Sequence, residues 1–162
     1  MISFIKIAIL PETYYLGHKV EMTLENSKTA DLFKGFMPLR KSILNKKENC
    51  VLLLHEYGLN TSFETFTPQT LHTNWALQEV LDFKQSSVDF LQYTLPSRNY
   101  AVFKHCGGIS EFANSMRYIF TEWLPNSGYE VAKAPHFEKI IPLFPPEPET
   151  REEEIWIPII NK

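Results

Sequence analysis

The sequence has few of the features that mark several large classes of protein. Only two cysteines, Cys50 and Cys106, occur among 162 residues, and they form no CxxC motif. This excludes a disulfide scaffold, and two unpaired thiols are typical of a reducing cytoplasm, where we expect the protein to lie. No apolar run reaches the ~20 residues that a membrane-spanning helix needs. The first ten residues carry a lysine and no small-residue cleavage site, unlike a secretory signal.

Excess positive charge and the common catalytic motifs are also missing. There are 16 Lys and Arg against 19 Asp and Glu, a formal net charge of -3. Nucleic-acid binders usually carry a basic surface, so we expect no direct binding of nucleic acid. The sequence lacks the glycine motifs that bind phosphates and the GxSxG motif of serine hydrolases. His105 and Cys106 are adjacent and would point to opposite faces of a strand, so we predict no metal and no cofactor.

Aromatic residues, in contrast, are abundant. The chain has 12 Phe, 7 Tyr and 3 Trp. A surplus of rings indicates either a ring-rich core or a cavity or interface lined with rings, and composition alone leaves both open.

The hydrophobic pattern predicts seven strands and two helices. The strands fall near residues 3–9, 15–25, 51–57, 73–81, 98–106, 136–141 and 154–160. The clearer helix begins around Ser110 and ends at Leu124, before Pro125. Its apolar face consists of Phe112, Met116, Ile119, Phe120 and Trp123. An earlier helix starts after residues 26–27 and extends towards Ile43, with Pro38 expected to kink or interrupt it.

The order strand, helix, strand, strand occurs twice along the chain. We therefore predict one α+β domain, residues 1–162, made of two β-α-β-β units at about 10–85 and 95–160. The units should be related by a pseudo-twofold axis. We expect one antiparallel sheet with helices on one face and a ligand groove on the other.

Alternation along the last two strands suggests a binding site. Ile155, Ile157 and Ile159 share one face, suited to packing under a helix, and Trp156 lies on the opposite face. If strands 136–141 and 154–160 form a hairpin, Glu138 can share the helix-free face with Trp156. An acid beside a large ring is a plausible receptor for a cation. The alternative is an edge-strand carboxylate that simply faces water.

Several strings of residues resemble a known family. They are "YAVFKH", "WLPNSGYE", "PHFEKI" and the closing "IWIPI", supported in the first half by "LENSKTADLFKGFMPLRKSI". Together they resemble the GyrI-like small-molecule-binding domain, also called the AraC-type effector-binding domain, over about residues 7–160. The chain is similar to the stand-alone members, which lack a DNA-binding helix-turn-helix.

The resemblance implies the duplicated fold and a groove for amphipathic, often cationic small molecules. It assigns the central acid of that groove to Glu138. It implies an aromatic wall formed by Tyr57, Trp75, Tyr100 and Trp156. Glu122 falls on the polar face of its predicted helix and is left outside the site.

The favoured function is thus a cytoplasmic module that binds drug-like molecules, for sensing or sequestering toxic compounds. Two alternatives stay open. Relatives of this fold hydrolyse strained electrophiles such as cyclopropane-bearing alkylators, and Glu138 could serve as a general acid or base in such a reaction. The second alternative is a protein-interaction role of the gyrase-inhibitor type, with the acidic, proline-rich stretch 142–154 as a docking arm.

Overall fold

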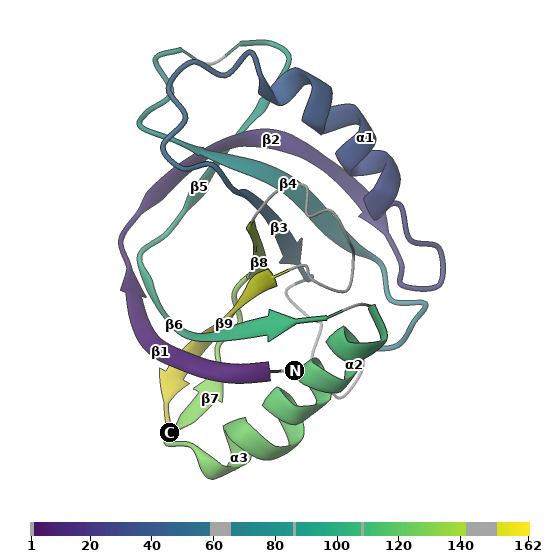
Figure 1. Ribbon diagram of the computed structural model, residues 1–162, viewed down its shortest axis with the longest axis vertical. Coiled ribbons are helices and arrows are strands. Elements are labelled where there is room, and N and C mark those ends of the chain that lie inside the picture. The colour runs from purple at the N-terminus through teal and green to yellow at the C-terminus, as the bar shows by residue number, and fades with distance from the viewer. Residues whose placement is uncertain (1, 59–65, 86, 108, 142–151) are drawn as a thin grey trace.

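The structure is a computed structural model that describes residues 2–58, 66–85, 87–107, 109–141 and 152–162. Most of the acidic stretch 142–154 lies outside these residues, so its proposed docking role is not tested. The chain forms one nine-stranded antiparallel sheet that curls strongly, with helices on its outer side (Figure 1). Within the described residues, no helix combines the length and the apolar character needed to cross a membrane.

The predicted order of elements is confirmed. The first half contains β1 (Ile2–Leu10), β2 (Thr13–Met22), α1 (Thr29–Arg40), β3 (Val51–Glu56) and β4 (His72–Val80). The second half contains β5 (Leu91–Leu95), β6 (Arg98–Cys106), α2 (Ile109–Tyr118), the π-helical turn η1 (Ile119–Trp123), α3 (Leu124–Asn126), β7 (Tyr129–Val131), β8 (His136–Ile141) and β9 (Glu152–Asn161). The order β2-α1-β3-β4 recurs as β6-α2-β8-β9. The short strands β5 and β7 were not predicted.

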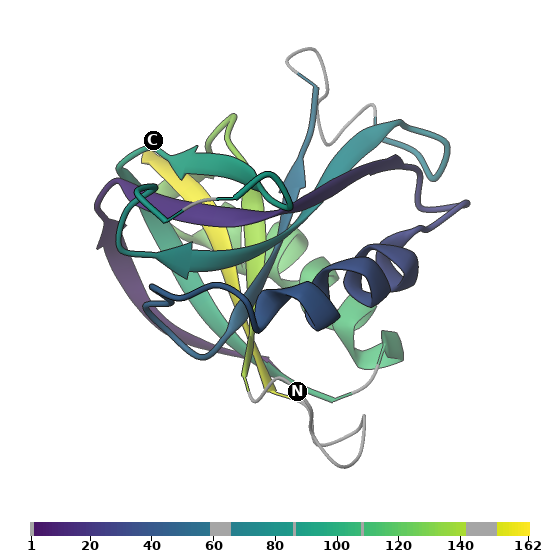
Figure 2. The same cartoon turned by 90° about the horizontal axis from the view of Figure 1, so that it is seen from above.

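The pairing of strands interlocks the two halves. The sheet order is β1-β6-β9-β8-β3-β4-β2-β5, with β7 paired to β9. Strand β3 pairs with β8 at the seam, where Leu53 lies opposite Glu138 and His55 opposite His136. Strand β1, which leads directly into β2, pairs with β6, and β5, which leads into β6, pairs with β2. Each half therefore extends a strand onto the other half (Figures 1 and 2).

Both helices cover the outer face of the sheet, as predicted. Leu32 and Phe36 of α1 pack on the β2, β3 and β4 strands of the first half. In the second half, Ile119 of the helical segment packs on β9, together with the partly buried rings of Phe112, Phe120 and Trp123. The residues of β9 that they meet are Ile155, Ile157 and Ile159. The predicted apolar face of this helix and the isoleucine face of β9 are both confirmed.

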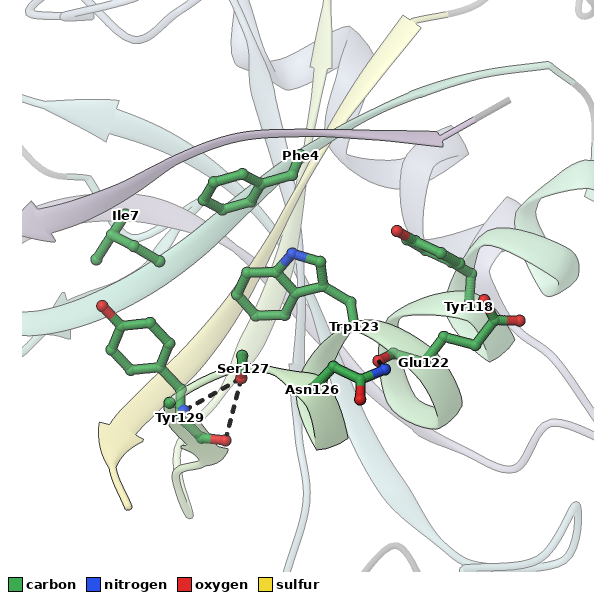
Figure 3. A pocket seen from close by; sticks show the side chains of 9 residues that line it. Phe4, Ile7, Tyr118, Glu122, Trp123, Asn126, Ser127 and Tyr129 are labelled. Carbon is green, nitrogen blue, oxygen red and sulfur yellow. Dashed lines mark hydrogen bonds between the residues drawn. The ribbon is translucent and has the colours of Figure 1, made fainter.

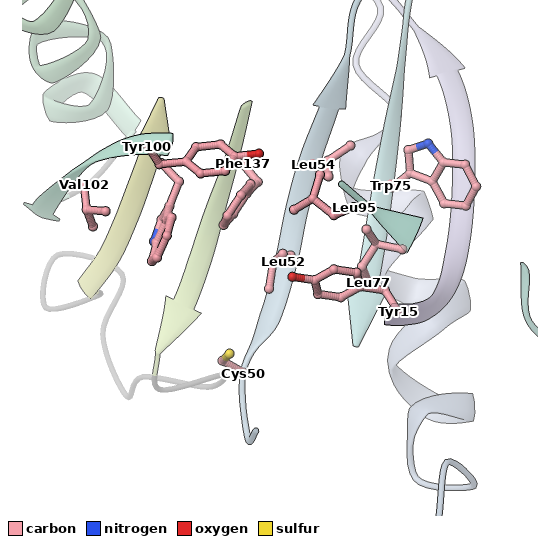
Figure 4. Close-up of a cluster of buried hydrophobic side chains, with 11 residues drawn as sticks. Tyr15, Cys50, Leu52, Leu54, Trp75, Leu77, Leu95, Tyr100, Val102 and Phe137 are labelled. Carbon is pink, nitrogen blue, oxygen red and sulfur yellow. The ribbon is translucent and has the colours of Figure 1, made fainter. Parts of the chain in front are cut away.

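The inner face of the sheet encloses a second core, rich in aromatic rings (Figure 4). Its buried members are Tyr15, Cys50, Leu52, Leu54, Trp75, Leu77, Leu95, Tyr100, Val102, Phe137 and Trp156. The Phe137 and Trp156 rings stack with centroids 5.2 Å apart, and the Tyr100 ring meets Phe137 edge-on at 5.2 Å. Part of the surplus of rings is therefore core.

The register of β8 and β9 differs from the one expected for the proposed site. Phe137 lies opposite Trp156, and Glu138 lies opposite Ile155. Glu138 is thus on the helix-bearing face and not on the face of Trp156. Alternation could not show this, because β8 is buried on both faces and its apolar residues do not identify the side that faces a helix.

Helix α1 also differs from the prediction, since it continues through Pro38 to Arg40. Pro38 lies in the last turn of α1, so few backbone hydrogen bonds of the helix remain to be formed after it. The Arg40 side chain is buried and donates hydrogen bonds to Gln78 Oε1 at 2.7 Å and Asn49 Oδ1 at 3.0 Å. These contacts fasten the end of the helix to the sheet despite the proline.

Substitution of two glycines in the first half should change the free energy of unfolding in opposite directions. A Cβ on Gly17 would overlap the backbone carbonyl of Ala76 in β4, whereas a Cβ on Gly35 in α1 would meet no atom within 4 Å. We expect Gly17→Ala to lower the free energy of unfolding by about 1–3 kcal/mol, because β2 and β4 must move apart. Gly35→Ala should raise it by about 0.5–1 kcal/mol through helix propensity. Urea denaturation of both variants checks this, and equal effects would contradict the close approach at Gly17.

Candidate functional site

A cavity of about 1050 Å³ opens at the end of the sheet where β3 ends and β8 begins. Its walls come from strand residues at this end and from the segments that join the strands. The described lining residues are Glu21, Glu56, Tyr57, Gly58, Phe66, Leu71, His72, Thr73, Tyr93, Thr94, Pro96 and residues 131–136. The cavity therefore lies at the seam between the two halves.

Tyr57 is the centre of an aromatic cluster in this wall. Its ring centroid lies 5.4 Å from that of Phe66, 5.5 Å from His72 and 5.5 Å from His136. Tyr57 follows β3, Phe66 precedes β4, and His72 and His136 are the first residues of β4 and β8, so both halves of the chain contribute to the cluster. The Phe66 and His136 rings meet the Tyr57 ring nearly at right angles, so the cluster presents both ring faces and ring edges to the cavity.

The charged groups of the lining are mostly acidic. Glu56 is held in place by two donors, since Trp75 Nε1 lies 3.4 Å from its Oε1 and Tyr93 Oη lies 3.2 Å from its Oε2. Glu21 supplies a second carboxylate to the wall of the cavity, and Lys133 supplies an ammonium group. The hydrogen bonds orient the Glu56 carboxylate at the cavity.

Behind Tyr57 lies a buried ion pair. His55 Nε2 donates to Glu138, at 3.0 Å from Oε1 and 2.8 Å from Oε2. His55 Nδ1 donates to Asn74 Oδ1 at 2.8 Å, while the Asn74 amide nitrogen faces Met22 Sδ and Thr29 Oγ1. Both ring nitrogens thus face oxygen acceptors, which an imidazole satisfies fully only as the protonated imidazolium.

The histidines of this region are held in different charge states. Burial alone would lower the pKa of His55, but the Glu138 charge and hydrogen bond outweigh it and raise that pKa above 6.5. Burial and the neighbouring His55 charge lower the pKa of His136 to about 3, and burial lowers that of His72. No three His, Cys, Asp or Glu side chains in the described ranges converge to hold a metal ion.

The structure places the predicted site residues in two separate groups. Tyr57 lines the cavity and Glu138 lies one ring behind it, next to His55. Trp75, Tyr100 and Trp156 belong instead to the buried cluster of the inner face.

The two indoles of that cluster already contact the chain's own cations. Lys19 Nζ lies 5.3 Å from the Trp75 ring centroid, and Lys139 Nζ lies 4.9 Å from that of Trp156. The ring faces that the sequence suggested for a ligand are thus partly occupied by lysines.

The sequence analysis missed Glu56, His55, Phe66 and His136 as residues of this region. One signal was available: His55 and Tyr57 share a face of their strand, as do His136 and Glu138 of theirs. Pairing of these two strands would have brought the four side chains together. Phe66 and Glu56 gave no comparable signal.

A smaller hollow of about 520 Å³ lies between β1 and the α2–α3 region (Figure 3). Glu122 lines it, together with Tyr118, Trp123 and Phe4. Glu122 is thus outside the larger cavity. The Trp123 ring packs on Phe4 and Phe103, each at 5.0 Å between centroids, so it serves mainly to join β1 to the helix.

Comparisons with known proteins identify relatives of this fold. A family model described as Cass2, integron-associated effector binding protein, matches residues 6–159. No curated protein matches the sequence. The structure is similar to SAV2435 bound to tetraphenylphosphonium, with a TM-score of 0.67 and 17% identity, over 98% of this chain and 94% of that one.

Two further structures share the fold. The EcmrR C-terminal domain gives a TM-score of 0.73 and 13% identity, over 100% of this chain and 98% of that one. The integron cassette protein VCH_CASS2 of Vibrio cholerae gives a TM-score of 0.63 and 15% identity, over 98% of this chain and 99% of that one. At these identities the comparison establishes the fold alone.

The histidines predict a stability maximum near pH 6.5. The pKa of His55 is raised on folding, so its contribution is complete below 6.5 and is lost as the pH rises through the raised value. The pKa values of His72 and His136 are lowered, so their contributions are present above 6.5 and are lost as the pH falls. Each histidine can change the free energy of unfolding by at most about 1.4 kcal/mol per pH unit.

Urea denaturation at pH 5.5, 6.5, 7.5 and 8.5 measures both arms of this curve. In His55→Gln the decline above pH 6.5 should flatten, while a smaller acid arm remains because burial still lowers the pKa values of His72 and His136. An alkaline arm as steep in that variant as in the wild type would contradict the assignment to His55.

Proposed function

Since the chain belongs to the Cass2 family of integron-associated effector-binding proteins, we propose that it binds amphipathic, cationic small molecules in the cavity at the ends of β3 and β8. The fold and family agree with the resemblance to GyrI-like effector-binding domains seen in the sequence. The observation that carries the proposal is the aromatic cluster around Tyr57, with carboxylates beside it and behind it.

The size and surface of the cavity suit a drug-sized molecule. Ligand pockets are commonly about 300–1000 Å³, lined mainly by apolar and aromatic groups with a few polar ones. The volume here, about 1050 Å³, is slightly above that range. A rigid molecule with aromatic substituents could stack on Tyr57 and Phe66 without a large rearrangement of the wall.

The charges favour a positive ligand. A cation over the Tyr57 ring would gain about 0.5–2 kcal/mol from the ring's negative face. Glu56 faces the same cavity, and Glu138 lies behind the ring, so carboxylates flank Tyr57 on two sides. The neutral His72 and His136 add ring surface without repelling a cation.

A structural relative supports the same class of ligand. SAV2435 was solved with tetraphenylphosphonium, a cation surrounded by four aromatic rings. That compound is therefore a suitable first probe. Sensing or sequestration of toxic compounds in the cytoplasm is the role we propose, and the absence of a disulfide at Cys50 and Cys106 agrees with that compartment.

Carboxylate variants test the proposal. Measured at pH 8 by isothermal titration calorimetry, Glu138→Gln should weaken tetraphenylphosphonium binding about tenfold, because a poorly hydrated counter-charge is removed. Glu56→Gln should weaken it about two- to fivefold, since water screens this carboxylate more.

Glu122→Gln is the matched control, because it removes one acid from the separate, smaller hollow. Its affinity should equal that of the wild type. Equal losses in all three variants would indicate attraction by net charge alone and would contradict a built site.

A second function is favoured by one observation, the carboxylate–imidazole pair beside the cavity. Such a pair could hold a water for attack on a strained electrophile, as in a hydrolase. Incubation with a cyclopropane-bearing alkylator, followed by mass spectrometry of the ring-opened product, tests this. Turnover that is lost in Glu138→Gln supports the enzyme, and rates equal to buffer across a panel of such compounds reject it.

A further inference from the structure

The buried acid of the proposed site already has a cation beside it. His55 and Glu138 come from different halves of the chain and meet across the β3–β8 seam. The side chains are only 18% and 8% exposed, and both nitrogens of the ring donate to oxygens. Below the raised pKa of His55, the two side chains therefore form a pair of one imidazolium and one carboxylate.

We propose that His55 determines which ligands the site accepts, because a bound cation and the His55 proton compete for the charge of Glu138. This inference rests on the proposed function and adds to it a defined exchange: one cation enters and one proton leaves. The proton passes from His55 Nε2 to the solvent, and no bond of the ligand changes.

The geometry brings the two positive charges close enough to compete. Tyr57 lies between His55 and the cavity, with its ring nearly parallel to the imidazole, 15° between planes and 6.3 Å between centroids. A cation on the face of Tyr57 that points away from His55 would lie on the order of 10 Å from His55, with the Tyr57 ring between them. Repulsion at that distance favours loss of the proton.

The reverse effect follows from the same contacts. When His55 loses its Nε2 proton, Glu138 keeps a charge that no longer has a partner on that ring. A buried carboxylate without a counter-charge is costly, so it attracts the next available cation more strongly. By linkage, the factor by which the proton weakens cation binding equals the factor by which the cation weakens protonation.

The other titratable groups that face His55 do not provide the same exchange. From β8 they are Glu138 and His136, from β4 His72, from β9 Glu153, and from the end of its own strand Tyr57. His72 and His136 have lowered pKa values and are already neutral above pH 6.5, and the pKa of Tyr57 is raised by burial and by the Glu138 charge. Among these groups, His55 is the one that exchanges a proton above pH 6.5.

The exchange predicts a difference between classes of ligand. Permanently charged cations should bind more tightly as the pH rises, by up to about tenfold per pH unit below the pKa of His55 and with no further gain above it. A neutral ligand of similar shape displaces no proton, so its affinity should not depend on the pH in this range.

Calorimetry on the wild-type protein measures the exchange directly. Tetraphenylphosphonium is titrated from pH 6 to 9 in phosphate and in Tris, whose heats of ionisation differ, so that the number of protons released can be counted. We expect a fraction of one proton to be released per cation, with a maximum between the pKa values of His55 with and without the cation, and release to fall towards zero at the alkaline end. Triphenylphosphine oxide, a neutral relative, should release none.

The variant His55→Gln keeps a donor beside Glu138 but cannot titrate. Its tetraphenylphosphonium affinity should be nearly independent of pH. His18→Gln is the control: His18 bonds to the Asp89 carbonyl, away from the cavity, and this variant should keep the wild-type dependence. If His55→Gln does not fold, the proton count of the wild type still decides.

Two results would overturn the inference while leaving the proposed function in place. One is cation binding with a pH-independent affinity and no proton release. The other is a pH dependence that survives in folded His55→Gln. Absence of cation binding at every pH would reject the proposed function itself, and the exchange with it.

Discussion

The pairing of β3 with β8 is the constraint on which the site depends. It is the seam between the two halves, and its register places Leu53 opposite Glu138 and His55 opposite His136. His55 and Glu138 are therefore diagonal neighbours on one face, within reach of each other. A shift of one residue would turn Glu138 to the inner, ring-filled face and away from His55. The swapped extensions β1 and β5 hold the two halves in this register.

Groups suited to receive a cation are also satisfied internally in this structure. His55 lies against Glu138, Lys19 lies over Trp75, and Lys139 lies over Trp156. The physical reason is general, because a buried acid or an electron-rich ring face is more stable with a partner than without one. The three partners differ in one respect. Only the histidine can give up its charge near neutral pH.

The sequence was sufficient for the fold and partly sufficient for the site. Helix periodicity predicted the outer core correctly, because the opposite side of the second helix is much more polar, and the repeat of Ile155, Ile157 and Ile159 along β9 was assigned to the same core correctly. The recurring element order supports the proposed division into two repeats within one domain. Strand alternation did not orient Glu138, since β8 is buried on both faces. It also could not separate the Trp75, Tyr100 and Trp156 rings of the inner core from Tyr57 at the cavity, because that separation depends on where each strand ends.

The choice of histidine as the partner of Glu138 links stability to binding. A lysine or arginine there would keep its charge at neutral pH and would hold the acid permanently. An apolar neighbour would leave a buried carboxylate uncompensated in the empty protein, at a cost of several kcal/mol. A histidine stabilises the acid and can release it to a ligand with the loss of one proton. The same pair thus keeps the seam folded without a ligand and leaves a counter-charge available when a cation arrives.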